Sequence, residues 1–520
     1  MNFNISENKW FTSTAALFFL ACLCIAYATF YALYYADQPL LDFYSFRQTQ
    51  TALTSYWLIK NGIINFYETP VGGYPWSIPF EFPIYQAIVA LFSNSTGVGL
   101  DTSGRLISYL FLLLILPYTN SIFKKLDIDS RVSLVFSALL VTSPIYLYWS
   151  RTYMIETAAL FFTIAAINYF VNICVNGRGY AKFIFFITLG LLQKSTTPSP
   201  LFIAIGLCFL VYLIALGRQS GFSSVLSDVY VKRVLRASLM LVVPILITVL
   251  WVSYTDQIKN LSVFGSQITS SSLSNWNWGT LSQRFSYEFN NLVLLSRITK
   301  HNFFLGLGWI VTLCAIFYNW RRNRKVTVLI LVSILFGLAP IYTYTNLHYV
   351  HDYYQTANVI YLLAAVSISV VYLPIGNKWM LAVTIVLILV NIILFQTSEL
   401  STMMKRNFTD KTETQLAIAK VIKERTEKDA QIVIFGDDWS SVYPYYSERK
   451  GFAVPKWYKD YNKISVNPEL GAQPGKLGAV VYCPRVDLPK LSDLTSWSDN
   501  QNWEHLPIYG CDLFIPYVNK

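Results

Sequence analysis

Long apolar runs recur through the first 400 residues of this chain and decide what it can fold into. A helix that crosses a bilayer needs about 20 apolar residues, and most of the runs reach or approach that length. Composition agrees, because 54% of the 520 residues are hydrophobic and only 13% are charged. Soluble domains carry roughly 25% charged residues. We therefore predict about eleven helical membrane spans. They cover residues 11–34, 105–123, 130–149, 156–175, 180–193, 199–217, 236–253, 303–319, 326–343, 355–374 and 378–396.

Basic residues gather in the short connections on one side of the predicted bundle. Lysine and arginine are enriched in cytoplasmic loops, so this side is expected to face the cytoplasm. The net charge of +11 then reflects membrane orientation, and no nucleic-acid partner is expected. The basic residues of these connections are Lys124, Lys125, Arg131, Arg178, Lys182, Arg218, Lys232, Arg233, Arg236, Arg321, Arg322, Arg324 and Lys325.

The opposite side receives two long loops that are rich in aromatic residues, 36–104 and 254–302. An odd number of spans from a cytoplasmic N-terminus places the C-terminal part on this outer side as well. The first apolar run, 11–34, lacks a clear small-residue cleavage site and is expected to remain as the first helix. Residues 83–92 are too few to span the membrane and are expected to lie along its interface.

From residue 401 onward the composition changes to that of a soluble domain. Residues 412–426 show the spacing of an amphipathic helix, and residues 431–435 and 478–482 are short apolar runs typical of strands. We predict a small α/β domain over 401–520, following a membrane domain over 1–400. The predicted fold class is a polytopic α-helical membrane protein with a C-terminal α/β domain.

Two of the seven cysteines, Cys483 and Cys511, lie in the polar C-terminal part. If that part faces an oxidising compartment, they are candidates for a disulfide, and otherwise they are two buried thiols. The other five cysteines lie in or beside apolar runs and are expected to pack as small hydrophobic residues.

The first outer loop opens with an acid and a base close together, Asp42 and Arg47. They lie at the start of an amphipathic helix predicted over 46–61. A carboxylate there could take a proton from a hydroxyl group, and the planar arginine fork could hold a lipid phosphate. The alternative is an interfacial helix whose charges extend into the lipid headgroups.

Further along the same loop, residues 74–86 combine three prolines with five aromatic residues. Such a segment forms a stiff wall at the membrane edge. Glu81 lies among apolar neighbours and should therefore have a partner, because an unpaired charge there would be costly. Tyr85 and Gln86 follow it closely. The alternative is that the segment is only an aromatic belt.

Two short outer connections carry further charges. Arg151 and Glu156 lie between the third and fourth predicted spans, and Lys194 precedes the sixth. Ionisable residues at the ends of spans are functional candidates when they face the bundle interior. Glu156 could instead stabilise a helix N-terminus, and Lys194 could extend to the headgroups.

Two later outer segments complete the set of candidate residues. Arg284 follows Trp276–Thr280, which could present donors and a stacking face to a sugar or belong to an aromatic belt. His348, His351 and Asp352 form the other group. This spacing without a third well-placed ligand is a weak metal signal, so we expect hydrogen bonds to phosphate or sugar. No cofactor is expected, and a divalent metal is left open.

All of these polar groups lie at one membrane face, and the predicted spans carry few charges along their middles. A proton- or ion-coupled transporter would carry ionisable residues and interrupted helices near the bilayer midplane. The pattern therefore favours an enzyme that acts at the outer surface on a lipid-linked substrate. The alternatives are a transporter or flippase of lipid-linked glycans, and a scaffold whose outer domain recruits partners.

As an ordered set, these motifs resemble the GT-C glycosyltransferases, above all the branch of the lipid A aminoarabinose transferase and the protein O-mannosyltransferases. The resemblance covers roughly residues 10–220. It implies that Asp42 is the catalytic base and that Glu156 assists or orients. It also implies that residues of the proline-rich segment, Glu81, Tyr85 and Gln86, line the cavity for the lipid phosphate. The cation before the sixth span, Lys194, would contact the carrier phosphate.

The sequence departs from this family pattern at two places. The acid pair often found in the first loop of the mannosyltransferases is a single Asp42, with Arg47 five residues later. The lysine of the aminoarabinose branch's Lys-Pro-Pro-Leu run is replaced within Ile78–Glu81. Arg47 or Arg151 is expected to supply the missing cation.

The resemblance implies an inverting transferase that moves a hexose or pentose from a polyprenyl-phosphate carrier, such as undecaprenyl phosphate, to an acceptor hydroxyl. The expected partners are this donor, membrane lipids and an acceptor that is a glycan, a lipid-linked glycan or a protein. The expected location is the bacterial inner membrane, with the C-terminal domain in the periplasm.

Overall fold

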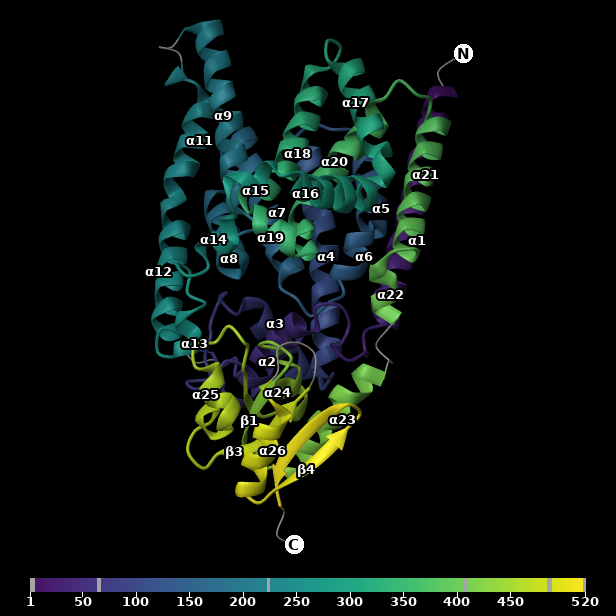
Figure 1. Cartoon of the computed structure of the whole chain (residues 1–520). Helices are drawn as coiled ribbons and strands as arrows, with labels where there is room; N and C mark the ends of the chain where they lie inside the picture. Colours follow the sequence, from purple (N-terminus) through teal and green to yellow (C-terminus); the bar gives the residue numbers. More distant parts are fainter. Residues whose placement is uncertain (1–4, 63–66, 222–224, 406–409, 484–488, 518–520) are drawn as a thin grey trace.

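A computed structural model describes residues 5–62, 67–221, 225–405, 410–483 and 489–517. It is a bundle of long helices with a small α/β domain at one end (Figure 1). Within these residues eight helical segments are long and apolar enough to cross a membrane. They are α1 (Ile5–Tyr34), α4 (Leu100–Lys125), α7 (Glu156–Asn176), α9 (Ser199–Ser220), α11 and α12 together (Val229–Met240 and Val242–Lys259), α18 (Arg324–Thr343), α20 (Thr356–Tyr372) and α21 (Asn377–Gln396).

The predicted number of about eleven spans is higher than the structure supports, although every predicted span is helical. One predicted span is divided into α5 (Ser130–Thr142) and α6 (Pro144–Trp149), because a proline lacks the amide that would continue the helix. Another, α8 (Tyr180–Lys194), has only 15 residues.

A ninth candidate span is a sharply bent pair of helices. Residues 287–302 and 304–319 meet at an angle of 90°. The first part includes the π-helix η1 (Asn290–Asn302), and the second includes α17 (Leu307–Asn319). Phe304 and Leu305 at the junction have a φ of 58°, a left-handed conformation that ends a right-handed helix.

The loops that carry the basic residues lie at the end of the bundle away from the α/β domain. Figure 1 shows this for the connections between α9 and α11 and between α17 and α18, both at the top of the view. The α/β domain, in yellow, lies at the bottom, and we call this the domain end of the bundle.

Two shorter helices, α2 (Ser45–Asn61) and α3 (Ile84–Thr96), lie between the bundle and the α/β domain (Figure 1). The helix predicted over 46–61 is α2, and residues 83–92 fall on α3. One whole turn of α2 is buried, including the polar residues Gln48, Thr49 and Gln50. It is therefore enclosed by protein at this level, with the α/β domain packed against it.

The α/β domain contains one five-stranded sheet. Its order is β2-β1-β3-β5-β4, with parallel pairing among the first three strands and antiparallel pairing at β5 and β4. The strands are β1 (Gln431–Phe435), β2 (Lys450–Ala453), β3 (Leu477–Tyr482), β4 (Trp503–Ile508) and β5 (Cys511–Pro516). The helices are α23 (Asp410–Arg425), α24 (Val442–Ser447), α25 (Tyr461–Val466) and α26 (Leu491–Asn500). The central strands β1 and β3 are almost entirely buried, which is why their apolar runs predicted them.

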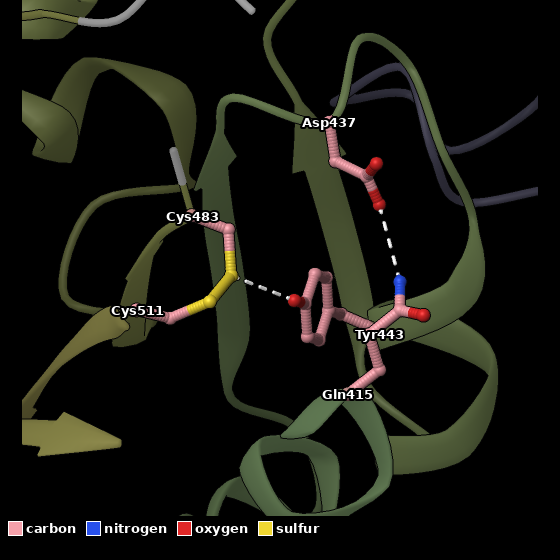
Figure 2. The surroundings of a disulfide bond; sticks show 5 residues. All are labelled: Gln415, Asp437, Tyr443, Cys483 and Cys511. Atoms are coloured by element: carbon pink, nitrogen blue, oxygen red, sulfur yellow. Dashed lines mark hydrogen bonds between the residues drawn. A yellow bond between two sulfur atoms is a disulfide. The ribbon is translucent and has the colours of Figure 1, made fainter. Parts of the chain in front are cut away.

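A disulfide joins Cys483, just after β3, to Cys511 at the start of β5. Figure 2 shows the hydroxyl of Tyr443 pointing at this bridge, 2.9 Å from the Cys483 sulfur, while Gln415 contacts Asp437 nearby. The cross-link closes a separation of 28 residues. By loop-closure entropy such a bridge stabilises a domain by about 3–4 kcal/mol.

The α/β domain is joined to the first loop by backbone hydrogen bonds. The amide of Gly451 donates to the Pro70 carbonyl and that of Ala453 to the Val71 carbonyl, at 3.1 and 3.0 Å. These contacts extend the sheet edge at β2 into the loop. The orientation of the domain on the bundle is thereby fixed by backbone as well as side chains.

A second junction is formed by two neighbouring tyrosines of α24. The Tyr445 and Tyr446 hydroxyls donate to the two oxygens of Asp101 on α4, at 2.6 and 3.0 Å. The Tyr446 hydroxyl also accepts from the Leu40 amide at 2.6 Å. One carboxylate thus links the first loop, the bundle and the α/β domain.

Replacing both tyrosines by phenylalanine should loosen the domain without unfolding it. Each lost hydrogen bond to a buried polar group costs about 1–3 kcal/mol, and Asp101 would lose both donors. We expect faster proteolysis between the bundle and the domain in the Tyr445→Phe/Tyr446→Phe variant. Tyr509→Phe is the matched control, because Tyr509 is exposed in the turn after β4. Equal cleavage of all three proteins would contradict this role for the junction.

Candidate functional site

The charged centre of the domain end is a buried carboxylate held between two arginines. Asp42, in the loop between α1 and α2, lies 2.7 Å from Arg151 and 3.2 Å from Arg105. Arg105 is on α4, and Arg151 is in the turn before α7. None of the three side chains has more than 1% of its surface exposed. We call these residues the buried triad.

Neighbouring groups complete the bonding of the buried triad. The Gln48 side-chain amide donates to Asp42 Oδ1 at 2.5 Å, and its oxygen accepts from the Tyr153 amide at 3.1 Å. Burial alone would raise the pKa of Asp42, but the positive charges of Arg105 and Arg151 hold it below its usual value. A carboxylate with a lowered pKa stays ionised and is a weak proton acceptor.

A second group of charges lies nearby and is more accessible. Arg47 on α2 pairs with Glu81 at 3.4 Å, and their side chains are 20% and 11% exposed. The Gln86 side chain donates to the other Glu81 oxygen at 2.8 Å. The expectation that Glu81 has a partner among apolar neighbours is met by these two contacts.

Lys194 and Glu156 form the other ion pair of this group, with 2.8 Å between Nζ and Oε1. Lys194 ends α8 and Glu156 begins α7, two helices that pack side by side. The Lys194 ammonium also lies 3.8 Å from the ring centre of Tyr354 and 5.1 Å from that of Tyr353. These side chains are only slightly exposed, at 11% for the lysine and 3% for the glutamate.

The two ion pairs lie close enough for their charges to influence each other. Burial alone would lower the pKa of Arg47, but the charges of Glu81 and Glu156 contribute to raising it above its usual value. The carboxylate of each ion pair therefore contributes to the pKa of Arg47. We call Arg47, Glu81, Glu156 and Lys194 the charged cluster, and its formal charges sum to zero.

Several buried polar atoms around the charged cluster have no hydrogen-bond partner among the residues that the structure describes. The most notable is the second oxygen of Glu156, because the first oxygen is held by Lys194. The others near it are Gln86 Oε1, Gln193 Nε2, Thr196 Oγ1, His348 Nδ1 and His351 Nδ1. Unpaired buried polar groups are costly, so their gathering here is typical of a ligand site.

The two histidines border the charged cluster as neutral rings. Burial, together with the nearby Lys194 cation, lowers the pKa of His348 to about 3 and that of His351 to about 4. The His351 ring stacks on Tyr353 with 5.1 Å between ring centres. No group of three or more acidic, histidine or cysteine side chains that could hold a metal occurs within the described ranges.

Two other predicted site residues, Arg284 and Tyr85, donate hydrogen bonds to backbone carbonyls. The Arg284 guanidinium donates to the backbone carbonyls of Tyr342 and Trp278 at 2.9 and 3.1 Å. The Tyr85 hydroxyl is buried and donates to the Gly104 carbonyl at 2.7 Å, tying α3 to α4. Asp352 follows His351 directly in the sequence, and one of its oxygens has no hydrogen-bond partner within the described part of the chain.

The sequence prediction did not include three residues that the structure places beside the site. Arg105 and Gln48 complete the buried triad's bonding, and the Lys259 ammonium lies 4.6 Å from the ring centre of Phe80, next to Glu81. Arg105 had a usable signal, since an arginine at the first residue of a predicted span requires a partner.

The comparisons with known proteins identify the fold. No protein family model matches the chain, and no curated protein sequence matches it. Among solved structures, ArnT from Cupriavidus metallidurans bound to undecaprenyl phosphate superimposes with a TM-score of 0.66 at 12% identity. The match covers 96% of this chain and 98% of that one. The chain shares the fold of the GT-C glycosyltransferases.

Two further solved structures agree with this fold. The arabinofuranosyltransferase AftD from Mycobacteria matches with a TM-score of 0.53 at 10% identity, over 96% of this chain and 40% of that one. The crystal structure of the Archaeoglobus fulgidus oligosaccharyltransferase in the apo form gives 0.50 at 12% identity, over 92% and 71%. The predicted fold class is confirmed, including the C-terminal α/β domain.

Removing the charge of Asp42 should destabilise the protein. The Asp42→Asn variant would leave two buried guanidiniums without a counter-charge, a loss of about 3–5 kcal/mol. We expect a fall in the thermal unfolding temperature of several degrees, measured in detergent. The control is Asp127→Asn, because Asp127 pairs with Lys325 at the surface and is 98% exposed. An unchanged unfolding temperature would contradict the structural role and favour a purely catalytic one.

The neutral His348 should make stability fall on acidification. Its pKa is about 3 in the folded protein and near 6.5 when unfolded, so protons bind the unfolded state preferentially below pH 6.5. The loss is about 1.4 kcal/mol per pH unit between these values. We expect the His348→Gln variant to lose about 2 kcal/mol less than the wild type between pH 7 and 5. Parallel stability curves for both proteins would contradict the lowered pKa.

Proposed function

We propose that this protein is an inverting glycosyltransferase that moves a sugar from a polyprenyl-phosphate carrier to an acceptor hydroxyl. The observation that carries the proposal is the charged cluster, in which two partly exposed cations and two carboxylates lie at the domain end of the bundle. The fold supports it, because ArnT of the same fold is described with undecaprenyl phosphate bound.

The proposed location of the reaction is the periplasmic face of a bacterial inner membrane. The basic loops lie at the opposite end of the bundle from the α/β domain (Figure 1), as expected if that end is cytoplasmic. The disulfide between Cys483 and Cys511 supports an oxidising compartment for the domain. The charged cluster then faces the periplasm.

In this proposal Arg47 and Lys194 bind the carrier phosphate. An arginine presents a planar fork that suits phosphate oxygens, and a lysine acts as a compact point charge. Both cations are now paired with carboxylates, so the phosphate would replace Glu81 and Glu156 as their partner. The sequence left Arg47 and Arg151 as alternatives for the missing lysine of the proline-rich run. We propose Arg47, because it is partly exposed, whereas Arg151 is buried against Asp42.

Glu156 is the proton acceptor that this geometry favours. Once Lys194 turns to the phosphate, the Glu156 oxygen that Lys194 now holds is released, and the second oxygen already has no hydrogen-bond partner among the described residues. The carboxylate can then face an acceptor hydroxyl within hydrogen-bond distance. The acceptor oxygen then attacks the anomeric carbon and its proton passes to Glu156. The bond from that carbon to the phosphate oxygen breaks, and polyprenyl phosphate leaves with the electron pair, so the configuration inverts.

The resemblance assigned the role of base to Asp42, and the buried triad favours a positioning role for it. Its carboxylate has no exposed surface and its pKa is lowered. A base must reach the hydroxyl proton within hydrogen-bond distance. We therefore propose that Asp42 holds the loop that leads into α2, the helix that carries Arg47, and that Glu156 takes the proton.

Measurements of carrier binding and of sugar transfer distinguish the phosphate-binding role of Arg47 and Lys194 from the proton-accepting role of Glu156. Arg47→Gln and Lys194→Gln should each weaken binding of undecaprenyl phosphate to the purified protein by about 10- to 100-fold, because each removes one charge-assisted contact. Glu156→Gln should retain binding and lose transfer. Binding can be measured by thermophoresis in detergent. Transfer can be measured in detergent as release of the lipid phosphate from a glycosylated carrier. Without a sealed membrane, transport across it cannot contribute to the signal.

The matched control is Lys60→Gln, since Lys60 is an exposed cation on the same helix as Arg47. It should bind undecaprenyl phosphate as the wild type does. Equal losses in Lys60→Gln and Arg47→Gln would show nonspecific attraction and overturn the assigned phosphate site. Binding of glycosylated carrier without any consumption would favour the transporter alternative.

A further inference from the structure

A second cavity lies between the first loop, the C-terminal end of α12 and the α/β domain. Its volume is about 660 Å³, within the range of pockets that hold small organic ligands. None of the charged-cluster residues lines it. The lining residues are Trp57, Glu68, Tyr74, Pro75, Trp76, Ser77, Ile258, Leu261, Lys428, Asp429, Gln431, Lys450, Gln473 and Lys476.

Three aromatic side chains form the wall that the first loop contributes. Tyr74 is 63% exposed, so its ring is available to a ligand, and Trp76 beside it is buried. Their rings meet edge to face with 6.5 Å between centres. The Lys450 ammonium lies 4.8 Å from the ring centre of Trp57. Amphipathic aromatic rings next to polar groups suit the apolar faces and hydroxyl edges of a sugar.

The opposite wall, from the α/β domain, is polar and carries an excess of positive charge. Lys450 pairs with Glu68 at 2.7 Å, and Lys476 pairs with Asp429. The third lysine, Lys428, makes no ion pair within the described residues. With three cations against two carboxylates, the lining favours a ligand that brings a negative charge.

One short segment contributes residues both to this cavity and to the charged cluster. Trp76 and Ser77 line the cavity, and Ile78, Phe80 and Glu81 line the small pocket that contains Arg47. Glu81 follows Trp76 by five positions, which is at most about 18 Å of extended chain. A ligand of several sugar units held in the cavity could therefore reach the charged cluster with one end.

We propose that this cavity binds an acidic oligosaccharide, the part of the acceptor that lies next to the reacting sugar. The role of the oligosaccharide as acceptor rests on the proposed transferase function. Its binding rests on the cavity alone. Aromatic stacking favours a saccharide. A carboxylate of that saccharide could bind Lys428, which has no ion pair within the described residues, and could replace Asp429 as the partner of Lys476. The apolar rim at Ile258 and Leu261 lies at the end of α12, so the site suits an acceptor held close to the membrane.

Binding of a defined acidic sugar tests the proposal without any transfer reaction. The full-length protein in detergent should bind trigalacturonate with a Kd on the order of 1 mM or below, measured by calorimetry, and neutral maltotriose at least about tenfold more weakly. The Lys428→Gln/Lys476→Gln variant should lose at least about tenfold in affinity for trigalacturonate. Tyr74→Ala should weaken both sugars by about tenfold.

Matched variants outside the cavity serve as controls. Lys463 pairs with Asp460 at the surface as Lys476 does with Asp429, and Tyr509 is exposed as Tyr74 is. Lys463→Gln and Tyr509→Ala should bind trigalacturonate as the wild type does. Failure to bind trigalacturonate, equal binding of maltotriose, or equal losses in the control variants would overturn the proposal.

The outcome is separable from that of the proposed function. Variants of the cavity should leave the affinity for undecaprenyl phosphate unchanged, and Lys194→Gln should leave the affinity for trigalacturonate unchanged. If the phosphate site fails while trigalacturonate binds as expected, the saccharide site stands and the transferase does not. If undecaprenyl phosphate binds as expected and trigalacturonate does not, only the saccharide site is rejected.

Discussion

The ionic contact between Asp42 and its two arginines is the constraint on which the domain end of the bundle depends. Asp42 comes from the first loop, Arg105 from α4 and Arg151 from the turn before α7. A buried ion group of this kind fixes geometry more than it adds stability, because desolvation offsets much of its attraction. Arg47 follows Asp42 by five residues, and Glu156 follows Arg151 by five. Holding the triad therefore brings one member of each ion pair of the charged cluster into place.

The α/β domain extends this constraint from the other side. It covers α2, whose Thr49 hydroxyl lies 2.9 Å from that of Ser441, and the α24 tyrosines bind Asp101 at the start of α4. The first loop is thus held between the helix bundle and the α/β domain. If the loop binds phosphate and acceptor as proposed, such support would matter, since small displacements of reacting groups are costly.

The sequence predicted the helices and central strands, which depend on local patterns of residues. It did not predict the contacts between side chains that are far apart in the chain. Apolar length identified every long helix, and the continuous apolar run of β1 identified the central strand. The strands β2, β4 and β5 were not predicted. In β4, for example, the residues are only half-buried or exposed and include a proline, so there is no continuous apolar run. Glu81 was expected to have a partner, but its identity as Arg47, 34 residues earlier, required the fold. Arg105 was missed because it opens an apolar run that was assigned to a span.

The balance of charge in the cluster couples the proposed steps of transfer. A glycosylated carrier phosphate is a diester with one negative charge, whereas the product monoester carries about −1.5 to −2 at pH 7. The product would therefore hold Arg47 and Lys194 more tightly than the substrate does. In the proposed mechanism Glu156 would be protonated during transfer, and after losing that proton it would pair again with Lys194, the contact that the structure shows. The same carboxylate would then both accept the proton and displace the product, and the neutral cluster would be the state regained after each cycle.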